Sequence, residues 1–317
     1  MRNRGSVALL AGMVLAGCTI NIPLFPGPGP LQETQVGGTG TAKVLLLDVS
    51  GMISSQEGDG LVPTPGMIAH FKEELTRAAK DEEIKAVVVR INSPGGTVTA
   101  SDILHHELKA FKAARKIPVI ASIMDVGASG GYYIAAATDM MFAHPSTITG
   151  SIGVIMLTVN ARGLLEKVGL EASAVTSGPR KDMGSPFRPM TPEERALFQE
   201  LIDSMYQRFL TVVQDGRPKL SMEQIKKLAD GRVYTGEQAK AAGLVDEIGY
   251  LEDAIDTAKK RAGLTEARVV MYRRPGEYSN NVYSKALTGN GLAGLAQLDV
   301  MSFVRGGTPQ FMYLWMP

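Results

Sequence analysis

The first half of the chain alternates between continuous apolar runs and apolar residues at helical spacing. The runs VLLLDVS (44–50), KAVVVRI (85–91) and PVIASIM (118–124) are typical of buried strands. Between them, residues 66–80 and 99–114 carry apolar side chains three and four positions apart, as amphipathic helices do. Strand, helix, strand, helix and strand in succession predict crossover connections, and therefore an α/β fold on a parallel sheet.

The second half of the chain has a more helical pattern. Helices are predicted over 191–215 and 252–262, followed by a short strand over 268–272. The first of these helices has a capping-box pattern, with Thr191 as the cap and Glu194 three positions later. We therefore expect a sheet-based first half and a helical second half.

The N-terminus has the pattern of a targeting segment. Basic residues precede an apolar run over 7–17, which is followed by Cys18. Eleven residues are too few to cross a bilayer, which takes about 20, so the run is interpreted as a secretory signal. The sequence LAGC (15–18) resembles a bacterial lipobox, in which the chain is cut before the cysteine and its thiol is lipidated. A chance cysteine after an ordinary cleaved signal is the alternative.

These features predict four segments. They are a signal peptide over 1–17, a Pro- and Gly-rich tether over 18–42, a folded domain over 43–272, and a flexible tail over 273–317 that ends in the apolar FMYLWMP. Lipidation of Cys18 would anchor the chain to a membrane of the cell envelope, on its periplasmic face. Threonine rather than aspartate at position 19 favours the outer membrane in a Gram-negative host.

Composition narrows the possible chemistry. Among 317 residues, 33 Lys and Arg balance 32 Asp and Glu, and no basic block stands out, so nucleic acid is not an expected partner. The four histidines and the single cysteine lack metal-ligand spacing, and neither a metal nor a cofactor is expected. The pair His105–His106 is typical of a solvated helix face.

The stretch GASGGYYIA (127–135) places one serine, Ser129, among three glycines between a strand and an apolar helix. Glycine at 130 lets other atoms approach closely. A hydroxyl near a helix N-terminus suits a nucleophile whose attack creates a negative oxygen. The alternative is that Ser129 is simply a helix cap, since serine is among the best N-cap residues.

A second glycine pair could complete such a site. INSPGG (91–96) follows a buried strand, and paired glycines there can present free N–H groups. One N–H from Gly96 and one from Gly130 would form an oxyanion hole, in which each donor contributes about 2.7–4 kcal/mol to the transition state. An ordinary strand-to-helix turn is the alternative.

Five motifs, in this order, resemble those of the signal peptide peptidase A family of serine peptidases. They are SPGG (93–96), GASGGYYIA, TGSIGVI (149–155), RKDMGSPFRPMT (180–191) and GRVYTGEQAKAAGLVDEIG (231–249). The resemblance covers roughly residues 44–272. It implies a fold of repeated β-β-α units similar to Clp protease and the crotonases, and hydrolysis of peptides or small proteins through an acyl-enzyme. It further implies a homo-oligomer in which one subunit's lysine completes its neighbour's site, and extended apolar substrates such as cleaved signal peptides.

The resemblance also assigns the remaining site residues. The family's general base is a lysine in a segment like that around Lys181, and Ser151, 22 residues after the nucleophile, would orient its amine. Lysine is a base only when neutral, which requires apolar surroundings and no close carboxylate. Asp182 must therefore point away. This chain has Gly178-Pro179-Arg180 where the family usually has glycine, lysine and tyrosine.

The sequence also offers other candidates for the general base and other functions for the chain. His144 is the nearest histidine in sequence, but it lies outside the Clp-like pattern, and Lys167 is typical of a solvated helix face. A non-catalytic, lipid-anchored scaffold or peptide-binding protein would keep the fold without the chemistry. Acyl-CoA chemistry of the crotonase class would use the oxyanion N–H groups without a serine nucleophile.

Overall fold

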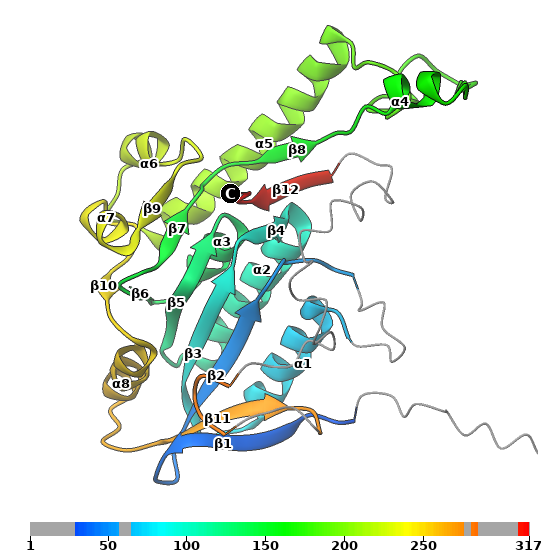
Figure 1. Cartoon of the computed structure of the whole chain (residues 1–317). Coiled ribbons are helices and arrows are strands. Elements are labelled where there is room, and N and C mark those ends of the chain that lie inside the picture. Colours follow the sequence, from blue (N-terminus) through cyan, green and yellow to red (C-terminus); the bar gives the residue numbers. More distant parts are fainter. Residues whose placement is uncertain (1–28, 57–64, 276–279, 285–309, 317) are drawn as a thin grey trace, which may run out of the picture.

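The computed structural model describes residues 29–56, 65–275, 280–284 and 310–316, and its centre is a mainly parallel sheet (Figure 1). The strands of this sheet are β1 (Gln32–Gly38), β2 (Lys43–Ser50), β3 (Ile84–Ser93), β5 (Val119–Ala128), β6 (Met140–Ala143), β7 (Ile148–Gly150), β9 (Val233–Thr235), β10 (Glu247–Ile248) and β11 (Arg268–Arg273). Within the described residues, they run in the order β1-β11-β2-β3-β5-β6-β10, with β7 beside β5 and β9 beside β7. Among the described strands of this sheet, the β1–β11 and β7–β9 pairs are antiparallel and the others are parallel.

Helices lie on both faces of the sheet (Figure 1). Those of the described chain are α1 (Met67–Lys80), α2 (Val98–Arg115), α3 (Gly130–Ala135), α4 (Arg162–Lys167), α5 (Pro192–Gly216), α6 (Met222–Leu228), α7 (Gly236–Ala241) and α8 (Leu251–Arg261). Buried residues of α1, α2 and α3 belong to one hydrophobic cluster, and those of α8 belong to a second. The α/β class with a parallel sheet and a helical second half is therefore confirmed.

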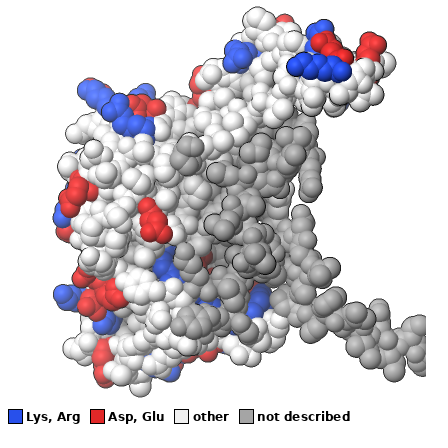
Figure 2. Space-filling view, in the orientation of Figure 1, with Lys and Arg blue, Asp and Glu red and all other residues white. Residues whose placement is uncertain are grey.

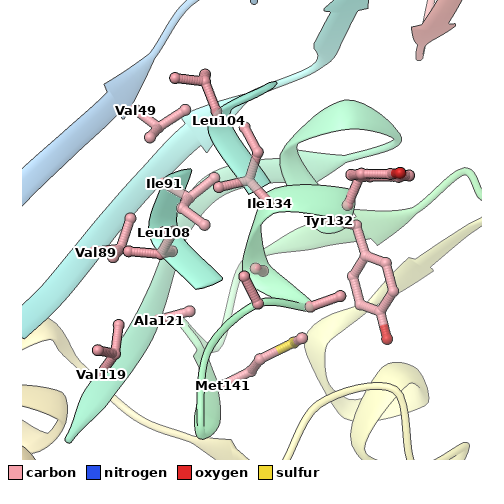
Figure 3. Packing of buried hydrophobic residues seen from close by; sticks show 14 of the residues in the cluster. Val49, Val89, Ile91, Leu104, Leu108, Val119, Ala121, Tyr132, Ile134 and Met141 are labelled. Atoms are coloured by element: carbon pink, nitrogen blue, oxygen red, sulfur yellow. The ribbon is translucent and has the colours of Figure 1, made fainter. Parts of the chain in front are cut away.

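The strand sequences explain why both faces are covered. In β2, Leu45 and Leu47 belong to the cluster with α1 and α2, whereas Val44 and Leu46 belong to the cluster with α8. Successive side chains of a strand point to opposite faces, so an unbroken apolar run needs cover on both. Figure 3 shows part of the first cluster, where side chains of β3 and β5 meet α2 and α3.

The predicted cap of α5 is confirmed. The Thr191 hydroxyl accepts from the N–H of Glu194 at 3.2 Å, and the Glu194 carboxylate accepts from the N–H of Thr191 at 2.9 Å. The reciprocal pair satisfies two donors that a helix start leaves open. The capping box therefore sets the first residue of α5. The start of this helix belongs to the projecting segment described below.

A second, smaller sheet involves the C-terminus. It consists of β4 (Gly95–Thr97), β12 (Gln310–Leu314) and β8 (Ile155–Leu157). The strand β12 lies between the other two and is antiparallel to both. Figure 1 shows β12 in red above the carboxyl ends of the central strands, close to α3. The C-terminal strand thus joins two segments, 95–97 and 155–157, that are far from it in the sequence.

Two strands lie outside the predicted folded segment of 43–272. The strand β1 falls within the predicted tether and pairs antiparallel with β11, and Glu33 of β1 forms an ion pair with Lys43 at 3.0 Å. Its sequence QETQVGG lacks an apolar run because it forms an edge of the sheet, so the hydrophobic pattern did not reveal it. The strand β12 falls within the predicted tail.

His105 is buried, which corrects its interpretation as part of a solvated helix face. The side chain is 4% exposed on α2, its ring lies edge-on to Tyr133 at 5.1 Å, and its Nε2 has no hydrogen-bond partner among the described residues. His106 is exposed, as expected. Burial lowers the pKa of His105 to about 4.

The buried imidazole predicts acid sensitivity. The folded chain keeps His105 neutral while the unfolded chain protonates it near its ordinary pKa, so stability is lost as pH falls from about 6.5 towards 4. We expect this residue to account for about 3 kcal/mol of the free energy of unfolding lost over that range. Denaturant titration of His105→Phe at several pH values should show a shallower loss than the parent chain. The His106→Gln variant is the control, and equal slopes for all three proteins would refute the assignment.

Candidate active site

Ser129 occupies a strained turn between β5 and α3. Its backbone has φ 51° and ψ −112°, and its side chain is 1% exposed. Although Ser129 stands at the N-cap position, its side chain makes no capping hydrogen bond, and its Oγ has no partner among the described residues. Each feature costs free energy of about 1–3 kcal/mol, and such strain tends to cluster at active sites. The helix-cap alternative therefore does not explain this serine.

Three glycines, Gly95, Gly96 and Gly130, bring the turn after β3 against the residue that follows Ser129. A methyl group on Gly130 would lie 2.4 Å from the Oγ of Ser101, 3.1 Å from the Cα of Gly95 and 3.2 Å from the amide nitrogen of Gly96. A side chain at 130 would therefore force the Ser101 hydroxyl and the Gly95–Gly96 backbone to shift, which favours glycine there. The turn after β3 and the turn after β5 therefore touch through their backbones.

The amide of Gly96 faces the strand β12. Its neighbours on β4 are engaged on one side, where the carbonyl of Gly95 accepts from the Ile53 N–H at 2.8 Å and the Thr97 N–H donates to Ile53 at 2.9 Å. Because alternate residues of a strand face opposite edges, the Gly96 N–H faces the other side, towards β12. The amides of Gly96 and Gly130 thus lie beside the same place, next to Ser129.

Ser151 lies beside Ser129 on the neighbouring strand. The strands β5 and β7 pair Ala128 with Gly150, and the Ser129 N–H donates to the Gly150 carbonyl at 2.8 Å. Ser151 is 7% exposed and, like Ser129, has a positive φ, of 49°. Parallel strands lie about 4.8 Å apart. The structure therefore brings Ser129, Ser151, Gly96 and Gly130 together at the carboxyl ends of the strands, where α/β proteins form their sites.

Lys181 lies elsewhere in a single chain. It is exposed on residues 158–201, called here the arm, which comprises α4 and the start of α5 and projects beyond the sheet (Figure 1). Ser129 lies in the body of the molecule. One chain by itself does not bring the two side chains together.

The carboxylates around Lys181 are paired with arginines. Asp182 accepts from Arg188 at 2.7 Å and 2.8 Å, and these hydrogen bonds lower the pKa of Asp182. Glu193 pairs with Arg180 at 2.6 Å. Within the described ranges, no carboxylate forms an ion pair with Lys181. Asp182 is thus paired with Arg188 and not with Lys181.

The rival bases do not reach Ser129. The Nδ1 of His144 is 2.8 Å from the hydroxyl of Ser146, and its ring lies edge-on to Tyr250 at 5.0 Å. Lys167 is exposed on α4, in the arm. Since the Ser129 hydroxyl has no partner in the described chain, neither residue serves it here.

Several expectations concern residues or groups beyond this cluster. Cys18 lies outside the described residues. Within the part of the chain that the structure describes, no three His, Cys, Asp or Glu side chains are grouped to hold a metal ion. In the same part, every helix is too short or too polar to cross a bilayer.

Sequence reasoning missed one participant, Tyr313 of β12. Its carbonyl oxygen would lie 2.0 Å from a methyl group on Gly95, and that methyl would lie 2.7 Å from the amide nitrogen of Gly130. The aromatic cluster in FMYLWMP was a signal for docking, but nothing in it showed the docking place.

Comparison with known proteins identifies the family. Residues 111–265 match the model of peptidase family S49. The chain is 40% identical to a putative signal peptide peptidase SppA of Enterococcus faecium, over 76% of this chain and 70% of that protein. It is 35% identical to a chloroplastic serine protease SPPA of Arabidopsis thaliana, over 71% of this chain and 33% of that protein.

A solved membrane-bound stomatin-specific protease is similar in structure, with a TM-score of 0.46 and 14% identity, over 74% of this chain and 98% of that one. The sequence match covers more than two thirds of the Enterococcus protein, which is enough to assign this chain to the same family. The chain belongs to peptidase family S49, the signal peptide peptidase A family, and is a serine peptidase.

Proposed function

We propose that this chain is a lipid-anchored endopeptidase of the cell envelope that cuts peptides with Ser129 as nucleophile and Lys181 of a neighbouring subunit as base. The observation that carries the proposal is the Ser129 hydroxyl, which is buried, unpartnered and held on a strained backbone beside the amides of Gly96 and Gly130. Membrane attachment would come from the lipidated Cys18.

The chemistry follows from this arrangement. The neutral Lys181 amine takes the proton of the Ser129 hydroxyl as its Oγ attacks the peptide carbonyl carbon. The N–H groups of Gly96 and Gly130 donate to the oxygen that becomes negative. The lysine then gives its proton to the departing amine, and water releases the acyl group with the same lysine as base. Ser151, beside Ser129, would accept from the amine and orient it.

The surface of the arm supports a shared site. Of the ten large apolar side chains exposed in the described residues, seven lie on the arm: Val159, Leu164, Val168, Leu170, Val175, Phe187 and Leu201. Charged residues of both signs lie at its tip (Figure 2), where Arg162 pairs with Glu166. Apolar side chains gathered on a projection mark an interaction surface. A second copy of the chain is the proposed partner, and head-to-tail contacts of this kind form a ring when the rotation between neighbours closes.

The proposed substrates are extended apolar peptides, including cleaved signal peptides. Two features support this class: the name of the Enterococcus relative, and the strand β4 beside the site, which already pairs with an extended segment, β12. The match to a peptidase family favours this function over a non-catalytic scaffold and over acyl-CoA chemistry.

A fluorophosphonate probe tests the proposal directly. We expect the purified, assembled protein to be labelled on Ser129, and labelling to disappear in Ser129→Ala. Labelling should also fall by a factor on the order of 10² or more in Lys181→Ala, because the serine loses its base. Lys167→Ala, which removes another exposed lysine of the arm, should be labelled like the parent. Full labelling of Lys181→Ala would refute the assigned base.

A further inference from the structure

The proposed general base lies in a segment without helix or strand. Lys181 belongs to turns and bends over residues 177–184. Locally, its N–H donates to the Gly178 carbonyl at 3.1 Å, and the Ser185 N–H donates to the Asp182 carbonyl at 3.0 Å. A base must come within hydrogen-bond reach of the proton that it takes, so its position has to be precise. A side chain that ties these turns to a helix would supply that precision.

Arg188 ties the Lys181 turn to the start of α5. Its guanidinium donates to the two carboxylate oxygens of Asp182, at 2.7 Å and 2.8 Å, and to the Asp182 carbonyl at 3.2 Å. It also donates to both carboxylate oxygens of Glu194, one of them at 3.0 Å. Glu194 is 5% exposed and belongs to the capping box of α5. The planar fork of arginine suits two carboxylates at once, which an ammonium group does not match.

The same arginine balances the charge beside Lys181. The other charged residues that line the cavity next to it, from the turn and from α5, are Arg180, Asp182, Arg188, Glu193 and Glu194. Arg180 pairs with Glu193 at 2.6 Å, which leaves Arg188 to balance the other two carboxylates of this lining. Its hydrogen bonds lower the pKa of Asp182, and that of Glu194 to about 2, so both are ionised at neutral pH. Without Arg188, the Asp182 carboxylate would be unpaired next to an amine that must be neutral to act.

We propose that Arg188 is a positioning residue for the base: it holds the Lys181 turn on α5 and keeps the Asp182 carboxylate occupied, so that the amine has no counter-charge. Arg188 acts through Lys181 and not on the substrate. The inference rests on the proposed role of Lys181 as base. It gives a function to the second half of the motif RKDMGSPFRPMT (180–191), which the catalytic residues leave unexplained.

The pH dependence of peptide cleavage by the assembled full chain separates positioning from a purely structural role. In Arg188→Gln, the ascending limb of kcat/KM should move to higher pH by about one unit, because an unpaired carboxylate stabilises a nearby ammonium. Below the limb, kcat/KM should fall by about tenfold. In Asp182→Asn, which breaks the same ion pair, the limb should move to lower pH, since the released guanidinium disfavours the ammonium. The double variant should return the limb to within about 0.3 unit of the parent.

Glu194→Gln is the matched control. It removes the other carboxylate that Arg188 binds, while Arg188 still occupies the carboxylate of Asp182. Its limb should stay within about 0.3 unit of the parent. Limbs that move in the same direction in Arg188→Gln and Asp182→Asn, or that do not move, would overturn the inference. If light scattering shows that Arg188→Gln does not assemble, Asp182→Asn carries the test, and a limb that is unmoved or moves to higher pH overturns the inference.

The two proposals fail separately. If Lys181→Ala cleaves peptides like the parent, Lys181 is not the base, and the roles assigned to Lys181 and Arg188 are both wrong. If Lys181→Ala is inactive while the limbs of Arg188→Gln and Asp182→Asn coincide, the base stands and Arg188 is only structural.

Discussion

Ser129→Ala is expected to abolish peptide hydrolysis while making the fold slightly more stable. Loss of a serine nucleophile lowers kcat by a factor on the order of 10⁴ or more. The same change removes a buried hydroxyl that has no hydrogen-bond partner in the described chain, and an unpartnered buried group costs about 1–3 kcal/mol. We therefore expect the free energy of unfolding to rise by about 1 kcal/mol. Peptide cleavage and denaturant titration measure the two effects on the same preparation.

Ser122→Ala is the matched control. Ser122 lies on the same strand, β5, and is 2% exposed, but it is not part of the candidate site. This variant should keep its activity within about twofold, since Ser122 lies outside the candidate site and its hydroxyl faces the sulfur of Met124. Retained activity in Ser129→Ala would show that another residue is the nucleophile. A large loss of stability in Ser129→Ala would show instead that the hydroxyl is structural.

Mixing two inactive variants is expected to restore activity. Lys181→Ala retains the serine, and Ser129→Ala retains the lysine, so each alone should be inactive. If each site takes its lysine from a neighbour in a ring, random equal mixing gives a working pair at about a quarter of the sites. The structural reason for expecting this is that Lys181 is exposed on an apolar arm and forms no ion pair within the described residues.

The measurement is peptide cleavage after the two variants are co-refolded or co-expressed. Mixing Ser129→Ala with the double variant Ser129→Ala/Lys181→Ala is the control and should stay inactive, because no subunit carries the nucleophile. If Lys181 instead bent back onto its own Ser129, no mixture would recover activity. Disruption of the arm by Leu164→Asp, at an exposed apolar position, should weaken assembly, measured by light scattering.

Local sequence determined most of the sheet and the reactive turn. The runs that form β2, β3 and β5 are apolar enough to need burial on both faces, and that need specifies a parallel sheet with helices on each side. The glycines around Ser129 predicted a close approach of two backbone segments, because a residue without a side chain leaves room for such a contact. The motif order also pointed to the peptidase family.

Tertiary structure alone decided the contacts between distant segments. The polar edge strand β1 and the docking of β12 beside Gly96 leave no periodic trace, because each depends on a partner far away in sequence. The motif around Lys181 likewise did not predict that this residue is exposed on the arm, because its position depends on the tertiary structure. Hydrophobic spacing encodes which side of an element is buried, whereas it does not encode which element, or which subunit, covers that side.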